Sequence, residues 1–158
     1  MKDFLHLYYR LLKRVLVVLV FLLIIPVFLQ VFSRFIPGLP RYIWTEEMAR
    51  FAFVWMIMIG AILAVREDTH FKIDVLPALH PRSERWLQGL NLLLLLIFAF
   101  VFVFAGWQYA QFGLGQHSEI AGLPMLSIYI AWPLTGLSWI LFIMEKVHDF
   151  ILDKADGS

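Results

Sequence analysis

Four long apolar runs constrain the fold of this chain more than any other feature. They cover approximately residues 15–35, 46–65, 87–109 and 124–144. A transmembrane helix needs about 20 consecutive, mainly apolar residues, and each run reaches that length. Four such helices with short loops account for residues 1–158, so we expect one membrane domain and no separate soluble domain. The runs therefore predict an all-α integral membrane protein with four transmembrane helices.

The composition agrees with this prediction. Hydrophobic residues make up 61% of the chain, the mean hydropathy is +0.79, and charged residues make up 16%. A soluble domain has about 25% charged residues. The net charge of +1 gives no support to nucleic-acid binding. Cysteine is absent, which excludes disulfides, thiolate metal sites and catalysis by a thiol.

The first apolar run follows a basic segment that carries Lys2, Arg10, Lys13 and Arg14. A secretory signal peptide begins in the same way, but this run is too long and no small-residue cleavage site follows it. We therefore expect an uncleaved first span. Pro26 should kink its helix, which neighbouring helices in a membrane tolerate.

The second run begins with a group of charged residues. Thr45 is a candidate N-cap, and Glu46 and Glu47 fall in the first helical turn, where carboxylates are favoured. Arg50 is close enough in sequence to pair with either glutamate. The group could be a polar clamp for a partner subunit or a capped helix start with an internal ion pair, and the sequence leaves both interpretations open.

The helix predicted from the second run has two different faces. One face is bulky and holds Trp44, Met48, Phe51, Trp55 and Met58. The other holds Glu46, Arg50, Phe53, Ile57, Gly60 and Ala64. Small residues four positions apart let another helix come close. We therefore expect the Gly60 face to pack against a helix and the bulky face to meet lipid or a partner.

The remaining segments predict two further spans. A polar loop over residues 66–74 leads to Pro81, which suits the first position of a helix. We expect a short amphipathic arm at the membrane surface there, with Trp86 at the interface. Pro124 should open the fourth span, Pro133 should kink it near its middle, and the charged tail after residue 144 should be short and frayed.

The basic residues predict the orientation in the membrane. Ten of the 13 lysines and arginines lie in the N-terminal segment, in residues 66–89 and in the tail. The other three are Arg34, Arg41 and Arg50. Because basic residues concentrate on the cytoplasmic side, we expect both termini and residues 66–89 in the cytoplasm.

No motif for catalysis, cofactor binding or metal binding is present. Asp68, His70, Asp74 and His80 have irregular spacing and no rigid element to hold them, so we expect a solvated loop. All five histidines lie outside the apolar runs or at their edges, which disfavours a haem-carrying membrane anchor. We find no phosphate-binding loop and no nucleophile elbow. We therefore expect no enzyme activity and no cofactor.

Two blocks of residues resemble a known family. The first block comprises Trp44, Glu46, Glu47, Arg50, Trp55, Gly60, Arg66, and His70 to Asp74. The second comprises Ser118, Gly122, Leu123, Pro124, Tyr129, Pro133 and Gly136. In this order and spacing they resemble the small membrane subunit, or Q subunit, of tripartite ATP-independent periplasmic (TRAP) transporters, the DctQ-like family.

The resemblance implies a non-catalytic subunit in a bacterial cell inner membrane. It also implies a large polytopic TRAP membrane subunit and a periplasmic substrate-binding protein as partners, with sodium-driven uptake of organic acids such as dicarboxylates or sialic acid. The small subunit would brace the large one. Candidate structural or partner-contact residues are Trp44, Glu46, Glu47, Arg50, Gly60, Arg66, His70, Asp74, Gly122 and Pro124. The outward segments 41–44 and 116–123 are candidates for docking the periplasmic protein.

Two other functions remain open on the residues alone. One is a membrane anchor of a respiratory or other membrane-bound enzyme, which the positions of the histidines disfavour. The other is a self-contained four-helix exporter, which would be expected to carry an acidic residue near the middle of a span. Only the shallow pair Glu46 and Glu47 is available for that role.

Overall fold

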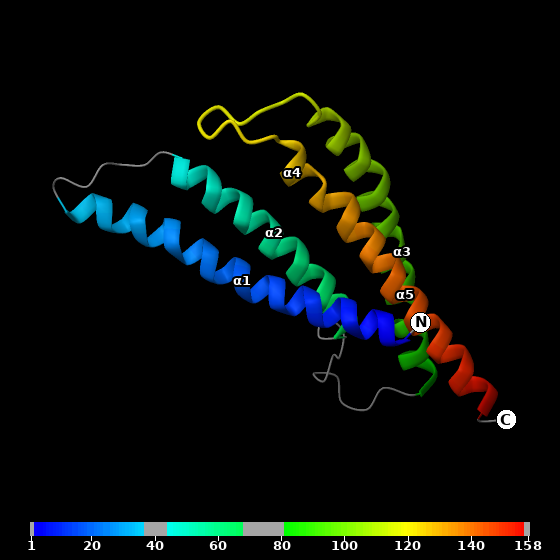
Figure 1. The fold of residues 1–158 in the computed structure, drawn as a ribbon. Coiled ribbons are helices and arrows are strands. Elements are labelled where there is room, and N and C mark those ends of the chain that lie inside the picture. The colour runs from blue at the N-terminus through cyan, green and yellow to red at the C-terminus, as the bar shows by residue number, and fades with distance from the viewer. Residues whose placement is uncertain (1, 37–43, 68–80, 157–158) are drawn as a thin grey trace.

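The structure, a computed structural model, describes residues 2–36, 44–67 and 81–156. It consists of helices, drawn in Figure 1: α1 (Lys2–Phe35), α2 (Trp44–Arg66), α3 (Pro81–Phe112), α4 (Leu126–Tyr129) and α5 (Ala131–Asp156). Four segments in these residues are long and apolar enough to cross a membrane: Asp3–Phe35, Trp44–Arg66, Gly89–Phe112 and Leu126–Val147. The predicted all-α architecture with four spans is confirmed.

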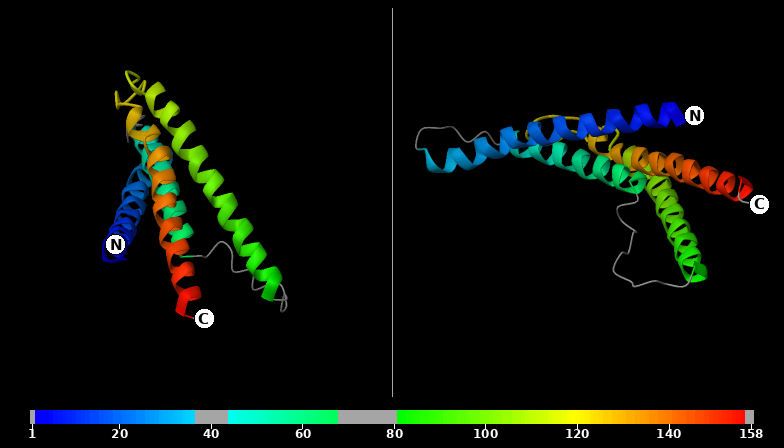
Figure 2. Two further views of the ribbon diagram at one scale, coloured as in Figure 1. Left: turned by 90° about the vertical axis from the view of Figure 1, so that its right-hand side faces the viewer. Right: turned by 90° about the horizontal axis from the view of Figure 1, so that it is seen from below.

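The helices are arranged as two pairs. α1 packs along α2, α3 packs along α5, and α2 also contacts α5, so α2 and α5 occupy the middle of the bundle. Figure 1 shows that the two pairs approach each other near the start of α1 and diverge towards α4. Both panels of Figure 2 show the first turns of α3 pointing away from α5. α1 begins and α5 ends at the same end of the bundle.

Glycines allow α3 and α5 to pack closely. A Cβ atom on Gly136 would lie 2.8 Å from the Ala99 carbonyl oxygen, and one on Gly106 would lie 2.9 Å from the Pro133 nitrogen. Ala99 and Ala131 are fully buried. Close packing of backbones over small residues is a common way for membrane helices to associate. The contact therefore depends on the absence of side chains at Gly106 and Gly136.

A second contact region joins α1, α2 and α5 near the start of α1. Its buried residues are Leu5, Leu12, Ile59, Ile62, Leu63 and Phe142. Two indole N–H groups attach α2 to the later helices: Trp55 donates to the Ser127 carbonyl (2.9 Å), and Trp139 donates to the Ala61 carbonyl (3.1 Å). The two indole N–H groups thus have hydrogen-bond partners within the chain, which the hydrocarbon of the membrane cannot supply.

The helices extend beyond the apolar runs that predicted them. The basic N-terminal segment is the beginning of α1, and the tail continues α5 to Asp156. The described part of the predicted amphipathic arm forms the first turns of α3, because no second proline interrupts this helix after Pro81. Pro133 is the third residue of α5, directly after the break from α4. Proline is tolerated in a first turn, since its missing N–H would have no partner there.

Within the chain, α2 makes its contacts from the bulky side, where lipid or a partner was expected, and the helix expected against the Gly60 face is not part of the described chain. Met58 of the bulky face is buried and Trp55 bonds to Ser127, whereas Phe53 and Ile57 are each 48% exposed. A Cβ atom on Gly60 would meet nothing within 4 Å. Trp55 and Met58 of the bulky face contact other helices of the chain, whereas the space above Gly60 is open.

Candidate functional site

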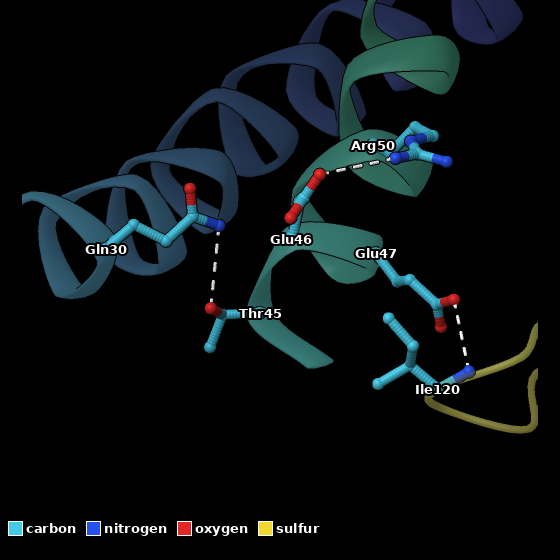
Figure 3. A network of polar contacts seen from close by, with 6 residues as sticks. All are labelled: Gln30, Thr45, Glu46, Glu47, Arg50 and Ile120. Atoms are coloured by element: carbon cyan, nitrogen blue, oxygen red, sulfur yellow. Dashed lines mark hydrogen bonds and ion pairs between the residues drawn. The ribbon is translucent and has the colours of Figure 1, made fainter. Parts of the chain in front are cut away.

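The first polar site lies at the start of α2, where Glu47 holds a loop. Glu47 is only 9% exposed. Its carboxylate accepts hydrogen bonds from the backbone N–H groups of Ala121 (2.7 Å) and Ile120 (3.3 Å), as Figure 3 shows for Ile120. Hydrogen bonds to a charged acceptor are stronger than those between neutral groups. Glu47 therefore fixes the tip of the loop between α3 and α4 to the first turn of α2.

The loop itself has a defined shape. The Ser118 N–H donates to the Leu123 carbonyl (2.8 Å), and the Leu123 N–H donates to Ser118 Oγ (3.1 Å). Gly122 has φ of +65°, a conformation that L residues with a side chain rarely adopt. His117 and Pro124 form an isolated antiparallel bridge just before α4. Gly122 and Pro124 therefore shape the segment that Glu47 holds.

Glu46 and Arg50 form a separate, exposed ion pair. Arg50 Nη2 lies 3.4 Å from Glu46 Oε1, and both side chains are 66% exposed. Thr45 lies within α2 rather than before it, so its predicted N-cap role was wrong. Its buried hydroxyl accepts a weak hydrogen bond from Gln30 Nε2 of α1 (3.5 Å), drawn in Figure 3. Glu46 and Arg50 therefore pair with each other, whereas Glu47 contacts the loop before α4.

The second polar site lies at the opposite end of α2, around Arg66. Its guanidinium donates to the Leu5 carbonyl (2.7 Å) and to Glu145 Oε1 (3.3 Å). It also lies over the rings of Tyr9 (4.6 Å) and Phe142 (5.0 Å). The Arg66 and Glu145 side chains are largely buried, at 11% and 15% exposed. Arg66 therefore links α1, α2 and α5 at one point.

Two further contacts strengthen this end of the bundle. Lys13 Nζ lies 2.7 Å from Glu67 Oε1, and the Tyr9 hydroxyl donates to the same carboxylate. The Lys13 ammonium, followed by the Tyr9 hydroxyl, holds the pKa of Glu67 below its usual value. Lys146 donates to the Val65 carbonyl (2.6 Å). Both ends of α2 are thus tied to other helices by polar contacts.

Between these two sites, an apolar groove of about 420 Å³ opens beside α2. Its wall includes Tyr8, Leu12, Trp55, Met58, Thr135 and Ser138. The Tyr8 and Ser138 hydroxyls bond to each other (2.8 Å), and Thr135 donates to the Ala131 carbonyl (2.7 Å). The hydroxyls in the mainly apolar wall of the groove therefore have hydrogen-bond partners within the chain.

The other predicted site residues have different positions. Trp44 is half exposed at the first position of α2, and Gly60 lies on its uncovered face. His70 and Asp74 lie outside the described residues, as do Asp68 and His80. In the part of the chain that the structure describes, no group of three or more possible ligands could hold a metal ion.

Sequence reasoning missed the residues that bind Arg66. Tyr9 of α1, and Phe142 and Glu145 of α5, had not been singled out as site residues. A signal was present, because an even number of spans between two segments returns the chain to the same side of the membrane. Arg66 and Glu145 each end an apolar run on the same predicted side, and that coincidence could have suggested the pair.

Comparison with known proteins agrees with these features. Residues 23–152 match the family described as tripartite ATP-independent periplasmic transporters, DctQ component. A relative from Haemophilus influenzae, described as a TRAP transporter small permease protein, is 29% identical over 94 residues. That match covers 59% of this chain and 58% of the relative. The family match includes Glu47, the loop that Glu47 holds, and the pair Arg66 and Glu145, and the chain belongs to the DctQ component family of tripartite ATP-independent periplasmic transporters.

Proposed function

We propose that the chain is the small permease subunit of a sodium-driven TRAP transporter for organic acids, such as dicarboxylates or sialic acid, in a bacterial inner membrane. Family membership makes it a transporter subunit rather than an enzyme. Its role in this proposal is to brace a large polytopic subunit that carries the substrate and sodium sites. The apolar groove supports a bracing role, because its hydroxyls are bonded within the chain.

The observation that carries the proposal is the uncovered face of α2. This face, which we call the Gly60 face, comprises Glu46, Arg50, Phe53, Ile57, Gly60 and Ala64. α2 is the helix between α1 and α5, and its buried residues, such as Ala52, Met58 and Ile62, lie on its other sides. The space above Gly60 is open, and small residues of this kind let a second helix approach closely. A helix of the large subunit is the partner that we assign to this face.

The loop held by Glu47 suits the second proposed partner. Ile120 and Leu114 are exposed on the segment between α3 and α4, whereas the backbone beside Ile120 is bonded to Glu47. A segment held in place loses little conformational entropy when a partner binds. We propose that this loop helps dock the periplasmic substrate-binding protein. Arg41, the other docking candidate, lies outside the described residues.

Replacement of Gly60 tests the bracing contact. Gly60→Leu should insert normally but co-purify with the large subunit at least about tenfold less, because loss of close helix packing costs about 1.4 kcal/mol or more. Gly89→Leu is the matched control, since a Cβ atom there also meets nothing within 4 Å. Equal recovery of the large subunit with both variants would contradict the proposal.

The charged residues provide a second test. Glu46→Gln combined with Glu47→Gln should reduce recovery of the assembled complex more than it reduces insertion of the chain. Co-purification of both partners at the level of the unchanged chain would count against a role for these glutamates in assembly.

A further inference from the structure

The first helix is longer than a membrane requires. α1 has 34 residues, which corresponds to about 51 Å at 1.5 Å per residue. The hydrocarbon layer is only about 30 Å thick. If the apolar run 15–35 fills that layer, residues 3–14 continue into the headgroup region of the leaflet nearest the start of α1.

These first turns nevertheless keep an exposed apolar surface. Phe4, Leu7 and Leu11 are 66%, 61% and 55% exposed. Their spacing of three and four residues places them on one side of the helix. The same side continues into the span through exposed Val18, Leu22 and Ile25. An apolar stripe that extends past the hydrocarbon is typical of a helix segment in the membrane interface.

Two arginines border this stripe. Arg10 and Arg14 each follow a stripe residue, Leu7 or Leu11, by three positions, and both are exposed. No described residue forms an ion pair with either of them. Lys13, by contrast, is turned towards Glu67 on another side of the helix. Asp3 is the only acidic residue of α1, so the positive charge beside the stripe is largely uncompensated.

We propose that Phe4, Leu7, Leu11, Arg10 and Arg14 form a binding surface for anionic phospholipids. The apolar side chains would enter the boundary between headgroups and acyl chains. The two arginines would extend alongside them to the lipid phosphates, since long basic side chains keep their charged ends at the interface. The attraction between one basic residue and an anionic membrane surface has a strength that corresponds to about a fivefold higher local concentration of anionic lipid. This surface is independent of the Gly60 face.

Site-specific labelling can test the proposal because the chain has no cysteine. A fluorophore would be attached to the full chain through Leu7→Cys, in nanodiscs of phosphatidylcholine. One sample would contain 10% spin-labelled phosphatidylglycerol and the other 10% spin-labelled phosphatidylcholine. From the quenching in the two samples, we expect the local concentration of spin-labelled phosphatidylglycerol to be at least about threefold higher than that of spin-labelled phosphatidylcholine, given the strength of such attractions.

The variant Arg10→Gln with Arg14→Gln should reduce that ratio to near one, while quenching by phosphatidylcholine persists. Arg34→Gln, which removes a cation from the other end of α1, should leave the ratio unchanged. Equal quenching by both lipids in the unchanged chain would overturn the proposal. So would a ratio that survives loss of both arginines, or an absence of quenching by either lipid, which would mean that protein covers the surface.

Discussion

Glu46 and Glu47 are neighbours in sequence but have different environments. Glu47 accepts two backbone hydrogen bonds from the loop before α4, whereas Glu46 pairs with Arg50 on an exposed surface. Replacing Glu47 by Gln should weaken bonds that each stabilise the loop by about 1.5–3 kcal/mol when the acceptor is charged. Hydrogen exchange of the Ile120 and Ala121 amides should then accelerate by at least about tenfold.

Glu46→Gln is the matched control for that variant. An exposed ion pair one helical turn apart contributes only about 0.5 kcal/mol, so exchange at the loop should stay unchanged. Equal acceleration in both variants would mean that the carboxylate of Glu47 does not hold the loop.

Glu67 makes the contact between α1 and α2 dependent on pH. Lys13 and Tyr9 lower the pKa of Glu67 in the folded chain relative to the unfolded chain. Its stabilising effect is therefore fully present above the ordinary glutamate pKa and is lost as the pH falls through the lowered value. We expect the thermal unfolding temperature in detergent to fall below about pH 4. Glu67→Gln should flatten that part of the profile, and an identical profile for the variant would refute the assignment.

Among the helices, the α3–α5 contact should be the least tolerant of added volume. Gly136→Ala places a methyl group 2.8 Å from backbone atoms of α3, which cannot move as a flexible side chain can. Overpacking of this kind typically costs about 1–3 kcal/mol, so the unfolding temperature should fall. Gly60→Ala should leave the unfolding temperature of the isolated chain nearly unchanged, because its Cβ enters open space. Similar losses in both variants would contradict the close α3–α5 contact.

The Arg66–Glu145 pair links helices that are far apart in the chain. Arg66→Met alone should destabilise the chain by about 3 kcal/mol, because it leaves a largely buried carboxylate without its partner. Adding Glu145→Met should recover part of that loss, since apolar side chains can replace a buried ion pair. Methionine also packs well between the Tyr9 and Phe142 rings. Losses that simply add in the double variant would contradict a direct pair.

At the scale of the whole molecule, the arrangement predicts a defined topology. α1 begins and α5 ends at the same end of the bundle, and the loop before α4 lies at the other. Because cysteine is absent, Asp3→Cys and Leu114→Cys can be labelled individually in intact cells. A membrane-impermeant maleimide should reach Leu114→Cys from outside and Asp3→Cys only after the membrane is opened. The reverse pattern would overturn the orientation expected from the basic residues.

The sequence by itself determined the number of spans and the family. Both depend on local features: runs of apolar residues long enough for hydrocarbon, and short blocks such as Trp44 to Arg50 and Gly122 to Pro124. The sequence also identified Glu47, Gly60 and Arg66 as residues to follow. It could not identify the contacts of Glu47 with residues 73 and 74 positions later, or of Arg66 with a carboxylate 79 positions later.

Only the tertiary structure decided which surfaces are covered. Helical periodicity divides α2 into a bulky face and a small-residue face, but it does not specify which neighbour lies beside each. Met58 of the bulky face is buried within the chain, and the close backbone approach occurs at Gly106 and Gly136 instead of Gly60. The physical reason is that a side chain is buried only where a second helix lies against it. A sequence pattern describes one helix, whereas the packing of α2 is set by the positions of α1, α4 and α5.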